Sequence, residues 1–150
     1  MKRAVNLGVI TLARGRCLAG RNLRPVSSNT TREQVADWVA AYERAWRTAG
    51  TSALAQIFAE DATYRQGPYD EPVTSLSAIC TMWEAEREGP DEVFDMTSSI
   101  IAVENATAVV RVEVFYGDPV SQEYRDLWVI RFACDGRCVS FEEWPFWPGQ

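Results

Sequence analysis

The sequence contains no histidine, the side chain that most often moves protons near neutral pH and a frequent zinc ligand. We therefore expect neither a zinc-type metal site nor a metal cofactor. Cysteine is scarce as well, and the four cysteines are Cys17, Cys80, Cys134 and Cys138. Cys134 falls at an expected turn and Cys138 inside the following strand, so a bond between them would be strained. Free thiols in a reducing cytoplasm are the simpler interpretation.

Long apolar runs are also lacking, since no stretch approaches the ~20 residues that a membrane-spanning helix needs. Basic residues are rare after position 31: residues 32–150 hold nine arginines against 21 acidic residues, a net charge of about −12. Nucleic-acid binding requires a basic face. We therefore expect a protein of the cytoplasm that has neither a nucleic-acid partner nor a membrane partner.

Residues 1–31 differ from the rest, with six basic residues and no acidic one. Their short apolar run resembles a signal peptide, but Asn6 interrupts it, Arg14 and Arg16 follow directly, and no convincing cleavage site is present. A transit peptide is a weaker alternative. We interpret 1–31 as a disordered extension, or as translation from a start codon upstream of the true one, and place a single domain at 32–150.

Helical signals dominate the first half of this domain. A capping box at Thr30-x-x-Glu33 and apolar residues at helical spacing predict a helix to about Thr48. A shorter helix follows from Thr51 or Ser52, then a short strand over residues 62–65. A third helix is expected from Thr74 or Ser75 to the Gly89-Pro90 break.

The period changes to two in the second half, which predicts strands over residues 93–103 and 107–116. A long hairpin over residues 121–147 follows, turning at Cys134-Asp135-Gly136. Three helices followed by antiparallel strands indicate an α+β fold, with the helices on one face of a curved sheet.

Counting outward from the turn gives the hairpin register: Phe132 opposite Cys138 and Trp128 opposite Glu142. This register places Asp126 and Glu142 among tryptophans on the helix side of the sheet. The next strand pairs Val112 with Asp126. The opposite face mixes charged and apolar residues, so it is either an ordinary solvated face or a homodimer interface.

Two motifs resemble a known family. FAEDATYRQGPY at 58–69 and RFACDGRCVSFEEW at 131–144 are similar to sequences of the nuclear transport factor 2-like superfamily, and most of all to SnoaL-like domain proteins. The resemblance covers about residues 32–147. It implies a cystatin-like cone in which helices and a bent sheet enclose an apolar pocket. This fold carries isomerases, cyclases, dehydratases, epoxide hydrolases and plain binding domains, so it does not name a reaction.

The resemblance also argues against one activity. Ketosteroid isomerases of this fold use a tyrosine, which Tyr42 matches, and two aspartates whose positions are Gln66 and Trp128 here. Neither an amide nor an indole can replace a carboxyl group in proton transfer. The SnoaL-like cyclases use an aspartate together with a histidine, which this sequence lacks.

The sequence therefore predicts a Trp-lined pocket for a small apolar or aromatic molecule, without a cofactor. The candidate catalytic residues are Asp126 or Glu142 as acid–base groups, with Tyr42 or Tyr64 steadying an oxyanion. The candidate ligand-binding residues are Trp38, Gln66, Trp83, Val112, Trp128 and Trp144. Packing of the aromatic side chains in the core, and solvated carboxylates at the pocket mouth, are the competing interpretations. The alternative function is a non-catalytic ligand-binding or dimerisation module.

Overall fold

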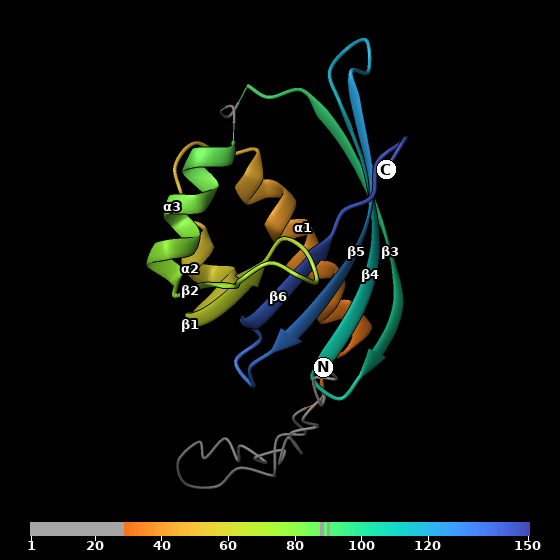
Figure 1. Cartoon of the computed structure of the whole chain (residues 1–150). Helices are drawn as coiled ribbons and strands as arrows, with labels where there is room; N and C mark the ends of the chain where they lie inside the picture. The colour runs from red at the N-terminus through yellow and green to blue at the C-terminus, as the bar shows by residue number, and fades with distance from the viewer. Residues whose placement is uncertain (1–28, 88, 90) are drawn as a thin grey trace, which may run out of the picture.

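The computed structural model describes residues 29–87, 89 and 91–150 (Figure 1). Nearly all of the extension expected at 1–31 lies outside these residues, so its interpretation stays a prediction. The elements are α1 (Arg32–Trp46), α2 (Leu54–Ile57), β1 (Phe58–Arg65), β2 (Val73–Thr74), α3 (Leu76–Glu86), β3 (Phe94–Glu104), β4 (Thr107–Tyr116), β5 (Gln122–Phe132) and β6 (Cys138–Trp144).

The strands form one six-stranded sheet in the order β2-β1-β6-β5-β4-β3. Pairing is antiparallel throughout except between β1 and β6, which run parallel. Figure 1 shows the sheet bending between its two edges, with the helices packed against one face. The α+β cone expected from the sequence is confirmed, and the two-residue strand β2 is an addition to it. None of the helices in the described part of the chain is long and apolar enough to cross a membrane.

Helix α1 begins one residue later than the sequence suggested. Thr31 is the N-cap: its hydroxyl accepts from the Gln34 backbone N–H at 3.2 Å, and the Gln34 side chain accepts from the Thr31 N–H at 2.9 Å. The capping box is therefore Thr31-x-x-Gln34 rather than Thr30-x-x-Glu33. The apolar stripe of this helix faces the sheet, which buries Trp38 and Tyr42 in the interior.

A buried arginine ties the third helix to the end of the first. Arg87 directly follows α3, and its guanidinium donates to the backbone oxygens of Ala45, Thr48 and Gly50 at 3.2, 2.6 and 3.1 Å. These carbonyls lie at and beyond the C-terminus of α1, where backbone oxygens lack partners within the helix. Glu84 pairs with the same guanidinium at 3.1 Å. This contact fixes the distance between α1 and α3 at one end of the cone.

The predicted register of β4 and β5 is confirmed. Val112 lies opposite Asp126 and Glu113 opposite Arg125. The side chains of Val112 and Asp126 point to the helix side and are buried, whereas Arg125 is exposed on the other face.

The predicted register of β5 and β6 holds for one pair and then fails. Phe132 lies opposite Cys138, but an irregularity follows and Arg131 pairs with Ser140. One extra residue on β6 shifts every later pair, so Trp128 lies opposite Glu143 rather than Glu142. Because side chains alternate between faces, the bulge exchanges the two glutamates. The sequence placement of Glu142 on the pocket side is wrong.

The interior of the cone is packed with aromatic rings around Tyr42. Its ring centroid lies 4.6 Å from that of Trp128, 4.9 Å from Trp83 and 5.5 Å from both Trp38 and Phe141. Rings at such distances and tilts attract each other beyond the area they bury. This cluster fills the closed end of the cone and leaves space beside it.

Candidate functional site

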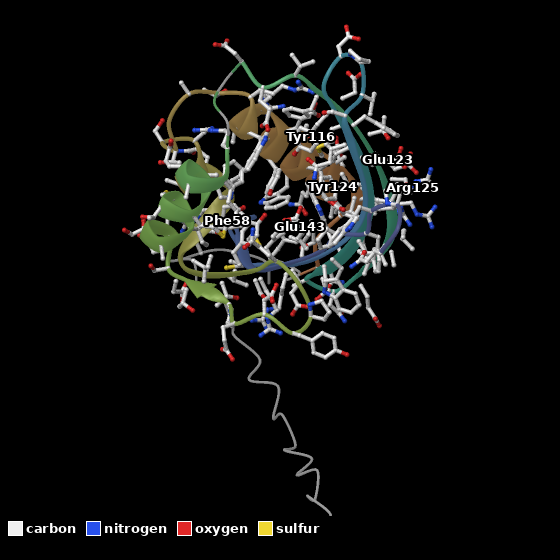
Figure 2. The ribbon with its side chains drawn as sticks, turned by 45° about the horizontal axis from the view of Figure 1, so that its top comes forward. Phe58, Tyr116, Glu123, Tyr124, Arg125 and Glu143 are labelled. Carbon is white, nitrogen blue, oxygen red and sulfur yellow. The ribbon has the colours of Figure 1, made fainter. Side chains whose placement is uncertain are left out.

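A cavity of about 490 Å³ opens beside the aromatic cluster. The bent strands form one wall, and α1, α3 and the segment before β3 form the others. Figure 2 shows Glu143, Tyr116 and Tyr124 within the interior, and Glu123 and Arg125 outside the sheet. The lining residues are Tyr42, Trp46, Tyr64, Gln66, Glu86, Glu92, Val93, Phe94, Met96, Val114, Tyr116, Gly117, Ser121, Gln122, Tyr124, Asp126, Trp128, Glu143 and Pro145.

A chain of hydrogen bonds runs along one wall. The hydroxyls of Tyr42 and Tyr64 lie 2.8 Å apart, and the Tyr64 hydroxyl donates to Glu143 Oε2 at 2.9 Å. The three groups come from α1, β1 and β6, so the parallel pairing of β1 with β6 brings Tyr64 next to the end of the hairpin. The chain holds the Glu143 carboxyl in one orientation.

Asp126 lies deeper in the same wall. Its side chain is only 4% exposed, and Oδ1 is buried with no hydrogen-bond partner. Desolvation raises its pKa to about 6, although the nearby Trp128 indole, the Glu143 carboxyl and the Phe146 backbone partly offset this effect. The Trp128 indole nitrogen makes no hydrogen bond of normal geometry either. A buried oxygen without a partner is costly unless it is protonated or meets a ligand.

Glu143 has the higher pKa of the two carboxyls. Burial, followed by the negative charge of Asp126, raises its pKa to about 8, and the hydrogen bond from Tyr64 opposes the shift. Two carboxyls that repel each other in a poorly solvated wall lose their protons in two steps. Near neutral pH the pair therefore holds one proton, with Glu143 as its main carrier.

The tyrosines of the hydrogen-bonded chain remain neutral donors. Burial, followed by the charge of Glu143, raises the pKa values of Tyr42 and Tyr64 well above the usual tyrosine range. Burial raises the pKa of Tyr116 as well. These hydroxyls can orient a carboxylate or a ligand oxygen but do not act as bases near neutral pH.

Two further carboxylates stand at the edge of the cavity. Glu86 accepts from the Gln66 side-chain nitrogen at 2.6 and 2.7 Å, and Glu92 accepts from the Trp46 indole at 2.8 Å. No lysine or arginine occurs among the lining residues in the described part of the chain. The cavity is therefore acidic as well as aromatic.

Five of the ten predicted site residues line the cavity: Tyr42, Tyr64, Gln66, Asp126 and Trp128. The other five do not. Trp38, Trp83 and Val112 are buried in the core. Glu142 lies on the outer side of β6, where Arg65 approaches it at 3.8 Å and the Trp144 indole donates to it at 3.1 Å. The competing interpretation, core packing, thus holds for Trp38 and Trp83.

Sequence reasoning missed the most important lining residue. The register predicted from the sequence places Glu143 on the outer face of the sheet, and Glu86, Glu92, Tyr116 and Tyr124 are not among the predicted site residues. The adjacent pair Glu142-Glu143 shows that one carboxylate must face each way. Only the bulge decides which one, and nothing in the local sequence marks it. The catalytic and ligand-binding roles themselves stay predictions.

Among residues 29–87, 89 and 91–150, no group of three or more cysteine, aspartate or glutamate side chains is arranged to hold a metal ion. Cys80 and Cys138 are free thiols, so the strained bond from Cys134 to Cys138 does not form. Burial raises the pKa of Cys138 to about 12, which leaves this thiol unreactive.

Comparison with protein families shows a match between residues 38–141 and the SnoaL-like domain. Comparison with curated proteins finds no match.

Several solved structures share the fold. A candidate SnoaL-like polyketide cyclase from Jannaschia is 12% identical with a TM-score of 0.62, and the similarity covers 84% of this chain and 91% of that one. A candidate ketosteroid isomerase from Kribbella flavida is 19% identical with a TM-score of 0.57, covering 79% and 80%. SalBIII, an epoxide hydrolase/cyclase-like enzyme of pyran ring formation in salinomycin, is 14% identical with a TM-score of 0.62, covering 77% and 93%. At these identities the likeness extends to the fold alone.

Proposed function

The chain belongs to the SnoaL-like family, and from this premise we propose that it binds a small, largely apolar or aromatic molecule in the cavity and moves a proton on it without a cofactor. One observation carries the proposal: the buried Oδ1 of Asp126 has no partner and lies in the cavity wall. A ligand hydrogen would satisfy it.

The two carboxyls have different roles in the proposed reaction. Asp126, ionised near neutral pH, takes a proton from the bound molecule, and Glu143, protonated at the same pH, returns one at a neighbouring position. One proton leaves and one arrives, so the reaction is an isomerisation, a cyclisation or a dehydration. Tyr64 is a positioning residue, because its hydroxyl holds Glu143, and Tyr42 supports Tyr64.

The relatives support this reaction class. Proteins of the same fold are described as a candidate isomerase, a candidate cyclase and an epoxide hydrolase/cyclase-like enzyme. The chain does not keep the acids of the ketosteroid isomerases, since Gln66 and Trp128 stand in their places. Here the acids are Asp126 and Glu143, on the last two strands of the sheet.

The carboxyl pair can be tested before a substrate is known. We expect carboxyl ¹³C shifts of Asp126 and Glu143 to titrate in two steps, at about 6 and about 8, and each single step to move when the other residue is replaced by its amide. Each single amide variant is the control for the assignment, because it removes one carboxyl signal and leaves the other. If both cavity carboxyls titrate near 4, they are solvated and the proposal fails.

A substrate could be identified as a small molecule that co-purifies with the protein from its own host and is detected by native mass spectrometry. With that molecule, Asp126→Asn should abolish most turnover while binding persists, and Glu143→Gln should lower kcat more than it changes KM. Equal activity of the wild type and both variants would overturn the acid–base assignment.

A non-catalytic binding module is the second candidate. The Tyr64 hydroxyl and Glu143 are already bonded to each other, which leaves few free donors for a developing oxyanion. In that case added ligand would quench the tryptophan fluorescence until the site is saturated, and the ligand would be recovered chemically unchanged.

We further propose that two copies associate through the outer face of the sheet. Leu127 and Val129 on β5 are half-buried there beside Val109 on β4. Such a mixed apolar face is typical of an interface between subunits.

A further inference from the structure

The ligand that best matches this cavity carries a positive charge. Its walls contain four carboxyl groups, Glu86, Glu92, Asp126 and Glu143, and none of the lysines or arginines in the described part of the chain lines it. Given the proposed function, on which this step rests, we infer that the bound molecule is an amine or quaternary ammonium compound with an apolar or aromatic body.

The carboxyls alone would not establish this, but one of them lacks a partner. Asp126 is 96% buried, and its Oδ1 makes no hydrogen bond of normal geometry with any group in the described part of the chain. Oxygens of the other three carboxylates accept from protein groups, namely the Tyr64 hydroxyl, the Gln66 amide and the Trp46 indole. A protonated amine seated at Asp126 would supply the missing donor and offset the buried charge at the same time, whereas a quaternary ammonium, which has no N–H, would offset the charge alone.

The aromatic walls of the cavity also favour a positively charged ligand. Seven aromatic residues line the cavity: Tyr42, Trp46, Tyr64, Phe94, Tyr116, Tyr124 and Trp128. A cation is attracted to the face of such rings, most of all to tryptophan. The protein itself offers an example at the edge: the Arg47 guanidinium stacks over the Phe94 ring at 3.7 Å from its centroid. Arg47 also pairs with Glu43 at 2.8 Å and does not line the cavity.

Other ligand charges fit less well. An anion would meet four carboxyls and no basic side chain, and repulsion at these distances is strong in a poorly solvated wall. A bare metal ion would find no group of three or more ligands within the described residues. A neutral molecule fits the shape but leaves the Asp126 charge unmatched.

A bound cation should also displace a proton from the carboxyl pair. It stabilises the ionised forms, so the proton shared by Asp126 and Glu143 leaves on binding, and affinity rises with pH while the amine stays charged. The other titratable groups facing the pair are Tyr42 on α1, Tyr64 on β1, Glu86 on α3, Glu92 before β3, Tyr116 on β4 and Tyr124 on β5. Tyr42, Tyr64 and Tyr116, whose pKa values burial raises, remain neutral over this range. Glu86 and Glu92 add to the attraction for the cation.

Three para-substituted phenols test which ligand charge the cavity prefers. Para-hydroxyphenyl-trimethylammonium and para-tert-butylphenol differ by a nitrogen cation in place of a carbon, and para-hydroxybenzoate carries the opposite charge. Isothermal titration calorimetry of the full chain should show the ammonium binding about tenfold or more tightly than the neutral phenol, and the benzoate more weakly than either. The preference should grow between about pH 5 and about pH 8, with proton release detected by repeating the titration in buffers of different ionisation enthalpy.

Matched variants locate the effect. Asp126→Asn and Glu143→Gln together should bring the ratio of ammonium affinity to phenol affinity close to one, and Glu86→Gln should lower this ratio less. Glu123→Gln, which removes a carboxylate from the outer side of β5, should leave it unchanged. Circular dichroism confirms that each variant is folded, and if the double variant is not, Asp126→Asn alone decides.

The outcomes separate the two proposals. If the neutral phenol or the benzoate binds as tightly as the ammonium, the charge inference is wrong, while small-molecule binding in the cavity stands. If none of the three probes binds up to millimolar concentration, the proposed function is wrong and the inference falls with it. A preference for the ammonium that survives the double variant would overturn the assignment to this cavity.

Discussion

At the scale of single residues, the molecule keeps two carboxyl groups in a place that opposes their ionisation. Asp126 and Glu143 have pKa values of about 6 and about 8, both raised first of all by burial. A soluble protein tolerates such groups when they serve a purpose that a neutral side chain would not. Here they give the cavity one proton to exchange and one negative charge to match.

The raised pKa values predict how stability depends on pH. Both groups bind protons more strongly in the folded state than in the unfolded chain, so their ionisation lowers the free energy of unfolding as the pH rises from about 4 to about 8. Glu143→Gln removes the larger share and can still accept from Tyr64. We expect its free energy of unfolding, measured by urea denaturation, to rise relative to that of the wild type by at least ~1 kcal/mol between pH 5 and pH 8.5. Glu123→Gln should show no comparable trend, and a difference that is the same at both pH values would show that Glu143 is solvated.

At the scale of elements, much of the fold follows from local signals, and the site does not. Alternating residues over 107–116 place β4 at its observed bounds, and Asp135-Gly136 marks the hairpin turn. The inward face of β4 and β5 follows from counting across one loop. The bulge opposite Arg131 and Phe132 of β5 cannot be found by such counting. One additional residue in β6 reverses which side chains of that strand face inward, and the residue types of the strand do not indicate it. The inward position of Glu143 is therefore evident only from the three-dimensional structure.

Helix packing at one end of the cone depends on one side chain. Arg87 donates to backbone carbonyls at and beyond the C-terminus of α1, and the guanidinium is almost completely buried. We expect Arg87→Met to lower the free energy of unfolding by about 2–3 kcal/mol, since buried carbonyls lose a charged donor. Urea denaturation measures this loss. Arg137→Met, at the exposed hairpin turn, is the matched control and should behave like the wild type, and an equal loss in both variants would contradict the capping role.

Residues near this end also line the cavity, so the same change reaches the site. Trp46 is the last residue of α1 and Glu86 the last of α3, and both contribute to the walls. If Arg87 sets their spacing, then Arg87→Met should weaken ammonium binding even at temperatures where the variant is fully folded. Calorimetry at low temperature tests this, and affinity equal to that of the wild type would confine Arg87 to a structural role.

At the scale of the whole molecule, the two faces of the sheet have different tasks. The inner face carries the cavity, and the outer face carries a band of half-buried apolar residues between charged ones. Val109 pairs with Val129 and Arg111 with Leu127, so the apolar band crosses from β4 to β5, and the cross-strand pair Glu113–Arg125 lies beside it. A solvated face has no need of such a band, whereas an isologous contact between two copies would bury it.

Charging this band should separate the copies without touching the cavity. We expect the wild type to sediment as a dimer and Leu127→Asp as a monomer, because two buried, unpaired carboxylates at a two-fold interface oppose association. Analytical ultracentrifugation measures the change, and Glu113→Gln is the control at the same face. Binding of the ammonium probe should persist in the monomer, since Leu127 points away from Asp126 on the same strand. A wild type that sediments as a monomer at high concentration would leave the outer face as ordinary surface, and a Leu127→Asp variant that loses the ligand as well would mean that the cavity depends on the partner subunit.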